Sequence, residues 1–415
     1  MNSGTKEKKS FVMGLPNRRS VVACLALAAI VPAFGCAPSK AETVQPSARI
    51  GVIAAMTGMM AAFGQAHQRG YAIALEEINA EGGVFGRPLA LDFYDDQGKP
   101  DIAIQGAGKL VDQDHVPVVI GSGGSETALA LVPVMTSKQV PLVVSTATAD
   151  NILEQKSPWV FRLSASSANV AAALVDFLKN HGAPKTMAVV YENTNFGQAT
   201  VAAMRKAAAN GGIAIVDEEA YNASAMSYSP MLQRVKEKKP EVLLFASYLL
   251  DGAALMRQSR QVGLNPRFFT AAPGGFGTAE FPTEDKGAGK DAEYTIAASQ
   301  WVPQGKWPGS REFDEKFFAR YGAHPAYQAM QAYAALKVVA AAIKQAKSLD
   351  PVAIRDALKN VRIESSAYGP IHFADNGQNE HPVFFTQVQK GKHTVVWPKD
   401  VAAAAVLETP SWSAR

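Results

Sequence analysis

The sequence predicts an α/β fold with two lobes, each built on a parallel β-sheet. From Arg49 onward, short β-branched runs alternate with helical segments of about ten or more residues, a pattern typical of parallel strands joined by helical crossovers. The alternation runs through two rounds that divide near residue 165, so two sheets are expected. The length of 415 residues also exceeds one ordinary domain of roughly 100–200 residues.

The first round shows its helical pattern clearly in one segment that starts near residue 65. There Tyr71, Leu75 and Ile78 lie on one face at spacings of four and three, and Gly82-Gly83 is typical of a helix end. Strands are expected in this round at 50–54, 89–94, 116–120 and 141–145, and further helices at 101–113 and 125–138. The second round is expected to contain helices at 167–181, 197–210, 228–238 and 251–262, with strands at 186–191, 213–217, 242–246 and 268–271.

The last third of the chain breaks this rhythm. Helices are expected at 309–321, 325–346 and 351–359, followed by strands at 369–373 and 382–389. These elements complete the two lobes rather than form a third core. We expect residues 401–415 to be a loosely packed tail.

The N-terminus has the pattern of an export signal at residues 1–35. Five basic residues precede an uncharged, mostly apolar stretch at 21–34 that ends in small residues, which is typical of a secretory signal and too short for a spanning helix. The whole chain has a net charge of +4 (41 basic minus 37 acidic), and residues 1–35 hold five basic residues and one acid, also +4. The mature chain is therefore near neutral, which argues against a nucleic-acid partner.

Cys36 is a candidate lipidation site. Ala33-Phe34-Gly35-Cys36 resembles the lipobox of bacterial lipoproteins, in which the chain is cut before the cysteine and the cysteine is acylated. Ordinary cleavage near Ala41 is the alternative. The other cysteine, Cys24, lies inside the signal, so the mature chain can form no intrachain disulfide, and an exported chain with a single cysteine favours acylation.

The motifs of common enzymes are missing or incomplete. The loop 121–125 (Gly-Ser-Gly-Gly-Ser) follows a strand and opens a helix, as phosphate-binding loops do, but it lacks the lysine of the nucleoside-triphosphate version. Glu126 stands where the dinucleotide version needs its third glycine. Histidine spacing supports no metal site, no Gly-x-Ser-x-Gly elbow occurs, and Asp95-Asp96 is more typical of solvated turn residues than of a catalytic pair. We therefore expect no cofactor, no metal and no catalysis.

Two hydroxyl clusters follow neighbouring predicted strands. Free backbone N–H groups, the helix dipole and the Ser125 hydroxyl could hold a carboxylate, although Ser125 could equally be a helix cap with nothing bound. The stretch 145–148 (Ser-Thr-Ala-Thr) follows the next strand. Because the carboxyl ends of parallel strands meet at one edge of a sheet, the two clusters predict one binding site there.

The most specific segment of the chain is 77–89, which reads Glu-Ile-Asn-Ala-Glu-Gly-Gly-Val-Phe-Gly-Arg-Pro-Leu. This segment and others, in order from about residue 48 to 398, resemble the leucine/isoleucine/valine-binding protein family, the periplasmic receptors of ABC importers for branched-chain amino acids and related solutes. The other matching segments are 50–53, 57–58, 63–64, 95–96, 118–121 with Ser125, 160–162, 196–197, Tyr248, 256–258, 261–264 and 368–373.

This resemblance implies the type I periplasmic binding protein fold, with two Rossmann-like lobes joined by three chain crossings and a ligand cleft between them. Lobe 1 would comprise 48–166 and 296–375, and lobe 2 would comprise 167–295 and 376–400. Ser125 and Thr148, with the backbone near Thr146 and Ala147, match the positions that hold the ligand's carboxylate. Three aromatic residues match cleft positions, with plain core packing as the alternative for each: Phe63, Phe196 and Tyr248.

One departure from the family pattern bears on the ligand. The amino-acid receptors hold the ligand's ammonium with a second-lobe glutamate, and the matching stretch here, around Gly274 at 272–275, contains no acid. Burying an ammonium without a counter-charge is costly. The sequence thus indicates a carboxylate without an α-amino group, such as an aromatic or aliphatic acid. Amino-acid binding stays open, since Asp251 or Glu280 could supply the charge from elsewhere.

Together these features predict an exported, monomeric solute-binding protein, either periplasmic or lipid-anchored at the outer face of the cytoplasmic membrane. Its partners would be a carboxylate or amino-acid ligand, a membrane permease and a separate ATPase subunit. The alternative is a ligand-sensing receptor module of the same fold. An enzyme is disfavoured because no nucleophile–base or metal constellation was found in the sequence.

Overall fold

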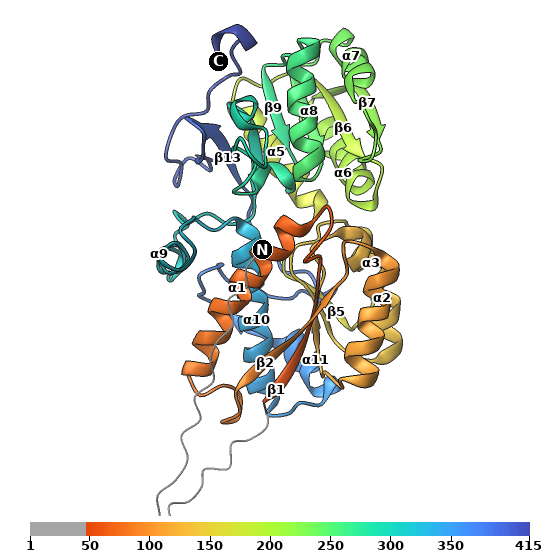
Figure 1. The fold of residues 1–415 in the computed structure, drawn as a ribbon, viewed down its shortest axis with the longest axis vertical. Helices are drawn as coiled ribbons and strands as arrows, with labels where there is room; N and C mark the ends of the chain where they lie inside the picture. Colours follow the sequence, from red (N-terminus) through yellow and green to blue (C-terminus); the bar gives the residue numbers. More distant parts are fainter. Residues whose placement is uncertain (1–46) are drawn as a thin grey trace, which may run out of the picture. The chain divides into compact units, whose positions relative to one another are not determined.

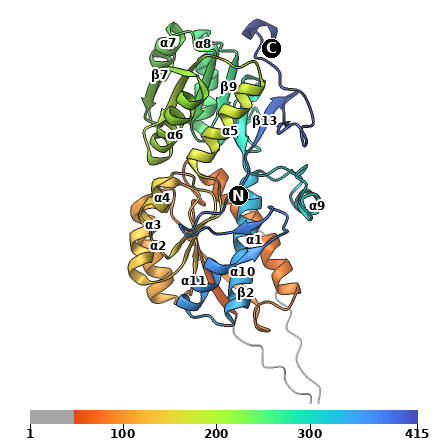
Figure 2. The same cartoon turned by 180° about the vertical axis from the view of Figure 1, so that it is seen from behind.

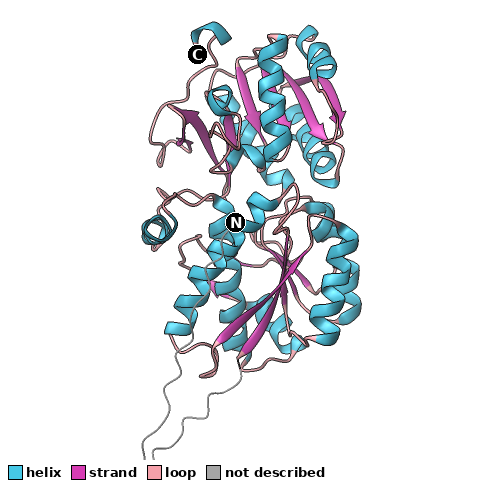
Figure 3. Cartoon of the chain, viewed as in Figure 1, coloured by secondary structure: helices cyan, strands magenta, loops and turns pink. Residues whose placement is uncertain are grey.

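The structure is a computed structural model that describes residues 47–415 (Figures 1 and 2). The predicted signal at 1–35 and Cys36 lie outside the described residues. Between residues 47 and 415, no helix combines the length and the apolar character needed to cross a membrane. The described chain contains two large sheets flanked by helices, in agreement with the predicted α/β architecture (Figure 3).

The first sheet has five strands in the order β2-β1-β3-β4-β5, and all of its pairings are parallel. Its strands are β1 (Ala48–Ala54), β2 (Leu89–Asp95), β3 (Val119–Ile120), β4 (Leu142–Val144) and β5 (Val160–Arg162). Its helices are α1 (Ala61–Ala80), α2 (Pro100–Gly108, continued by a π-helical turn over Lys109–Gln113), α3 (Ser125–Lys138) and α4 (Asn151–Glu154). Because β3 and β4 are neighbours, the loops that follow them lie side by side.

The second sheet has seven strands in the order β14-β13-β10-β9-β8-β6-β7. Its strands are β6 (Thr186–Glu192), β7 (Ala214–Tyr221), β8 (Val242–Ala246), β9 (Phe268–Ala271), β10 (Ile296–Ser299), β13 (Phe384–Gln389) and β14 (Lys392–Trp397). The last two are antiparallel additions to a parallel sheet. Its helices are α5 (Ser167–Asn180), α6 (Asn195–Gly211), α7 (Ser229–Glu237) and α8 (Leu249–Val262).

The helices of the last third return to the first lobe. They are α9 (Ser310–Tyr321), α10 (Tyr327–Ala346) and α11 (Pro351–Asn360), followed by the short antiparallel pair β11 (Arg362–Ile363) and β12 (Ile371–His372). Helix α10 packs along α1, and both contribute to one apolar core with β1. The chain therefore passes between the lobes three times: after β5, after β10 and before β13.

The lobe boundaries differ at their edges from the expected ones. Strand β10 pairs with β9 on one side and β13 on the other, so residues 296–299 lie in the second sheet, not in the first lobe. Residues 376–379 contact the first lobe instead, because Gln378 forms a bridge with Arg162. Strand β3 is shorter than predicted, since Pro117 has no N–H to donate and Val116 donates its own to Leu110.

The C-terminal segment 401–415 is packed on the second lobe rather than loose. The Trp412 indole donates to the Leu264 carbonyl at 2.9 Å, and the Arg415 guanidinium lies 3.5 Å from the centre of the Trp412 ring. Gln387 in β13 donates to the Leu407 carbonyl at 2.7 Å. An aromatic anchor and side chain–backbone bonds thus hold a segment whose one regular element is the short 3-10 turn Trp412–Ala414.

Candidate functional site

A pocket lies at the carboxyl ends of the first sheet, where residues of the two lobes meet. The space there amounts to about 210 Å³, part of it open to solvent. The pocket is lined by Phe63, Gly123, Ser125, Thr146, Ala147, Thr148, Phe196, Tyr248 and Pro273. Seven of the eight predicted binding residues are in this set, and none of the described lining residues is charged.

Gly274 is the predicted residue that does not line the pocket, although its neighbour Pro273 does. A Cβ atom at position 274 would lie 2.4 Å from the Ser247 carbonyl oxygen and 3.5 Å from the Phe196 ring. The backbone here is extended, so the constraint is contact rather than strain. A glutamate at this position would therefore require the chain around Ser247 to shift.

Ser125 opens helix α3 on the first-lobe side of the pocket. Its Oγ accepts a hydrogen bond from the Ala149 N–H at 3.3 Å, and the preceding Gly124 has no side chain to cap the helix. Behind the loop, the Asp96 carboxylate accepts from the Ser122 hydroxyl at 2.9 Å. Asp96 is fully buried, which corrects the expectation of a solvated turn residue: it holds the loop in place.

Thr146 and Thr148 supply two further hydroxyls from the loop after β4. The Thr146 Oγ1 lies 2.8 Å from Nε2 of His67, a buried residue of α1. Burial lowers the pKa of His67 to about 4, so its ring is neutral at physiological pH. The Thr148 hydroxyl is 3.5 Å from the Ser167 hydroxyl at the start of α5. This wall of the pocket consists of neutral hydrogen-bonding groups.

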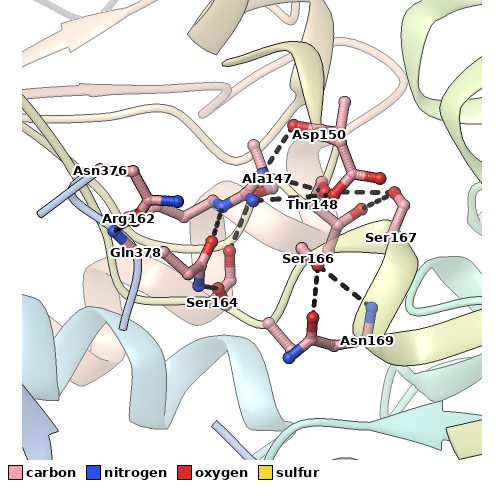
Figure 4. A network of polar contacts seen from close by, with 12 residues as sticks. Ala147, Thr148, Asp150, Arg162, Ser164, Ser166, Ser167, Asn169, Asn376 and Gln378 are labelled. Atoms are coloured by element: carbon pink, nitrogen blue, oxygen red, sulfur yellow. Dashed lines mark hydrogen bonds and ion pairs between the residues drawn. The ribbon is translucent and has the colours of Figure 1, made fainter. Parts of the chain in front are cut away.

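Arg162 lies behind the same loop, at the end of β5 (Figure 4). Its Nη1 donates to the carbonyls of Thr148 at 3.0 Å and Ala149 at 2.6 Å, and its Nε donates to Gln378 at 2.7 Å. Arg162 is only 2% exposed, and its acidic neighbour Asp150 is 3.9 Å away. Burial lowers the pKa of Arg162 to about 10, which leaves it charged at neutral pH.

The opposite wall is aromatic. Phe196 lies in the first turn of α6 and Tyr248 immediately precedes α8, both in the second lobe. The Tyr248 ring is 5.4 Å from Phe196 and 5.8 Å, edge to face, from Phe63 of the first lobe. The three rings thus form one apolar cluster across the two lobes while also lining the pocket. Smaller residues complete the cluster: Ala55, Met60, Ala246 and Ala272.

Neither acid considered as a substitute for the missing glutamate lines the pocket. The Asp251 carboxylate accepts from the Tyr221 hydroxyl and from the Tyr248 N–H at 3.3 Å, so it caps helix α8. Burial raises the pKa of Asp251 despite these bonds. Glu280 lies beyond the 3-10 turn Gly275–Gly277, outside the lining set.

Two other acids lie near the pocket: Glu126, which the sequence marked only as an obstacle to dinucleotide binding, and Glu192, which the sequence did not mark. Glu126 reaches across to the second lobe, where its carboxylate accepts from the Asn195 backbone N–H and from the Asn195 Nδ2 at 2.6 Å. Burial, followed by repulsion from Asp251 and Glu126, raises the pKa of Glu192 to about 7. One Glu192 carboxylate oxygen is buried with no hydrogen-bond partner.

His67 and Arg162 were missed as supporting residues for different reasons. His67 follows Phe63 by four positions on α1, so helical spacing could have placed it beside the pocket. Arg162 was noted only as part of a family motif, and its contact with Gln378 joins residues 216 positions apart. Among residues 47–415, no group of three or more histidine, cysteine or acidic residues could hold a metal ion.

Comparisons with known proteins agree with this architecture. A family model described as periplasmic binding protein matches residues 47–393. The Leu/Ile/Val-binding protein homolog 7 of Brucella abortus (strain 2308) is 29% identical over 404 residues, which covers 93% of this chain and 98% of the relative. Homolog 3 of Brucella melitensis is 27% identical over 353 residues, with 85% and 94% covered.

Solved structures share the fold at lower identity. A leucine-binding protein from Thermotoga maritima superposes with a TM-score of 0.78 at 23% identity, covering 84% of this chain and 97% of its own. A solute-binding protein of an ABC transporter from Rhodopseudomonas palustris BisB5, in complex with 3,4-dihydroxybenzoic acid, gives 0.74 at 23% identity, with 88% and 99% covered. Because the family model spans most of the chain, this protein belongs to the periplasmic binding proteins, alongside the leucine/isoleucine/valine-binding proteins.

Proposed function

We propose that this protein is the substrate-binding component of an ABC importer and captures a small carboxylate between its lobes. The observation that carries the proposal is the first-lobe wall of the pocket. There the hydroxyls of Ser125, Thr146 and Thr148 converge at the ends of β3 and β4, beside the uncapped start of α3. Hydroxyl donors and a helix N-terminus are groups that favour an anion.

The ligand class follows from the rest of the lining. The described lining residues include three aromatic rings and no acid, which favours an aromatic or aliphatic acid over an α-amino acid. The nearby acid Asp251 is already bonded to Tyr221 and Tyr248. The dihydroxybenzoate complex of the Rhodopseudomonas protein supports an aromatic acid, whereas a structure of a Streptococcus pneumoniae relative holds isoleucine.

Ligand capture would proceed by closure of the two lobes. The carboxylate would dock on the hydroxyls of the first lobe, and hinge motion would bring Phe196 and Tyr248 over the solute beside Phe63. A solute that binds the closed form better shifts the population toward it. The closed form would deliver the solute to a membrane permease, with ATP hydrolysis on a separate subunit.

The family places the protein outside the cytoplasm, and we propose that an acylated Cys36 anchors it to the membrane. Mass spectrometry of the mature N-terminus tests this anchor. A diacylglyceryl cysteine at position 36 would support it, and an unmodified N-terminus near Ala41 would contradict it.

A thermal-shift screen tests the function itself. Aromatic acids, aliphatic acids and branched-chain amino acids would be compared with their primary amides, since a ligand that binds only the folded state raises the melting temperature. We expect at least one carboxylate to raise Tm and its amide to raise it less. If no carboxylate shifts Tm, or if amides do so equally well, the proposed function is wrong.

A further inference from the structure

The first-lobe wall offers an anion only neutral donors, because no lysine or arginine is among the described residues that line the pocket. Yet the transfer of a carboxylate out of water is costly unless charge compensates it. A full positive charge lies one layer behind this wall. Arg162 is buried at the end of β5 and bonds directly to the loop that carries Thr146 and Thr148 (Figure 4).

A single peptide unit connects this charge to the pocket. The carbonyl of Thr148 accepts from Arg162 Nη1 at 3.0 Å, and the N–H of the same peptide, on Ala149, donates to Ser125 Oγ at 3.3 Å. Because Ser125 accepts this bond, its own proton is free to be donated into the pocket. Hydrogen bonds in such a chain polarise one another, so the guanidinium strengthens the serine as a donor.

The charged groups near Arg162 offset little of its positive charge, so this charge acts mainly on the loop. Among residues 47–415, Asp150 is the one acid within ion-pair distance, at 3.9 Å, and its side chain is 32% exposed, so water screens it. Glu126, next to Ser125, directs its carboxylate to Asn195 of the second lobe. The remaining Arg162 partners given above, the Ala149 carbonyl and Gln378, are neutral.

We propose that Arg162 is the counter-charge for the ligand's carboxylate, acting through the Thr148–Ala149 peptide and Ser125 without touching the ligand. This inference rests on the proposed function, since it assumes a carboxylate in the pocket. The alternative role for Arg162 is purely structural: it ties the loop to Gln378 in the segment before the third crossing. The two roles differ in whether its loss affects charged and neutral ligands differently.

The experiment measures one ratio by calorimetry: the affinity for a carboxylate divided by the affinity for its amide. The probes are benzoate, 3,4-dihydroxybenzoate, 3-methylbutanoate and leucine, each paired with its primary amide. In R162Q we expect the affinity for the carboxylate to fall by about tenfold, because a charge that acts across one layer of protein is lost. The affinity for the amide should fall by less than about threefold. R162K keeps the charge and should fall between the wild type and R162Q.

D150N is the matched control of opposite sign. It removes the charge that partly neutralises Arg162, so carboxylate affinity should rise by about twofold with no change for the amide. Equal losses for carboxylate and amide in R162Q, with no change in D150N, would overturn the inference and leave the structural role. If R162Q does not fold, D150N decides alone.

The wild-type protein separates this failure from that of the proposed function. If the wild type prefers none of the carboxylates over its amide, the proposed function fails and the inference falls with it. If the wild type prefers a carboxylate and R162Q retains that preference, only the role of Arg162 is wrong.

Discussion

The two walls of the pocket use helix N-termini in opposite ways. In the second lobe, the protein's own carboxylates occupy them: Asp251 caps α8, and Glu126 of the first lobe accepts the Asn195 N–H at the start of α6. In the first lobe, α3 begins after Gly124 with no side-chain cap and faces the pocket through Ser125. The start of α3 thus lies uncapped between two hydroxyl-bearing loops, where the proposed anion would bind.

The walls also differ in how firmly they are built. Behind the first-lobe hydroxyls stand His67, Asp96 and Arg162, each buried and each bonded to one of the two loops. The second-lobe rings are held by apolar packing, with buried acids behind them. Under the proposed function, the first lobe would be preorganised to hold the carboxylate and the second lobe would cover the apolar part of the solute.

The largest effect should come from removing the hydroxyls of the first-lobe wall. In a Ser125→Ala/Thr148→Ala double variant, we expect carboxylate affinity to fall by about 100-fold or more, since two hydrogen bonds to a charged group are lost. Calorimetry measures the affinity, and circular dichroism should show an unchanged fold. Unchanged affinity would refute the proposal that Ser125 and Thr148 hold the carboxylate.

The acids behind the aromatic wall should make stability depend on pH. The raised pKa of Glu192, about 7 in the folded protein, means that the folded state binds its proton more tightly than the unfolded state. The stabilisation is thus fully present below the unfolded pKa and is lost as pH rises through about 7. Asp251, whose pKa burial also raises, acts in the same direction.

Glu192→Gln should therefore make the protein more stable at pH 8, by about 2 kcal/mol after allowance for partial exposure, and flatten its pH profile. Thermal unfolding of the ligand-free protein between pH 5 and 8 measures this. Glu237→Gln, an exposed change on α7, serves as the control and should leave the profile unaltered. A profile that Glu192→Gln does not change would show that Glu192 is ionised without penalty.

The sequence predicted the fold class and the convergence of the two hydroxyl-bearing loops because both depend on local patterns. Alternating strands and helices predict parallel sheets, and Ser125 and Thr148 follow strands that are neighbours in that topology. Strands of two or three residues, such as β3 and β5, were harder to predict because a run that short shows no alternation of apolar and polar residues. Strand β10 was missed because its partners β9 and β13 come from distant parts of the chain.

The supporting layer could not be predicted for a related reason. Arg162 reaches Gln378, and Glu126 reaches Asn195 across the two lobes, so each role exists only after the chain has folded. The tail shows the same limit, since Trp412 docks near Leu264 without any repeating pattern. Local periodicity identifies elements, but not the single long-range bonds between them.

The hydrogen bonds that join the two walls should control how long the solute stays bound. Asn195→Ala removes one of the two hydrogen bonds that Glu126 accepts across the lobes and leaves the backbone bond in place. Loss of a bond to a charged group should destabilise the closed form and speed dissociation by about five- to tenfold. Stopped-flow measurement should show the change in the dissociation rate, with the association rate little altered. An unchanged dissociation rate would mean that the bond does not persist in the closed form.

The smallest effect should come from the support behind Thr146. His67→Leu leaves the Thr146 hydroxyl without its 2.8 Å partner, so the hydroxyl is free to rotate away from the solute. A neutral hydrogen bond of this kind corresponds to about a three- to fivefold loss of carboxylate affinity. The loss should be absent in a Thr146→Ala background, because His67 then has no hydroxyl to orient. Calorimetry on the single and double variants measures this coupling.

Since the pKa of His67 is about 4, the wild-type affinity should show no contribution from this ring between pH 6 and 8. Additive losses in the double variant would instead indicate that His67 acts by packing against the Gly123 loop. The first-lobe wall would then depend less on the buried polar residues behind it than its geometry indicates.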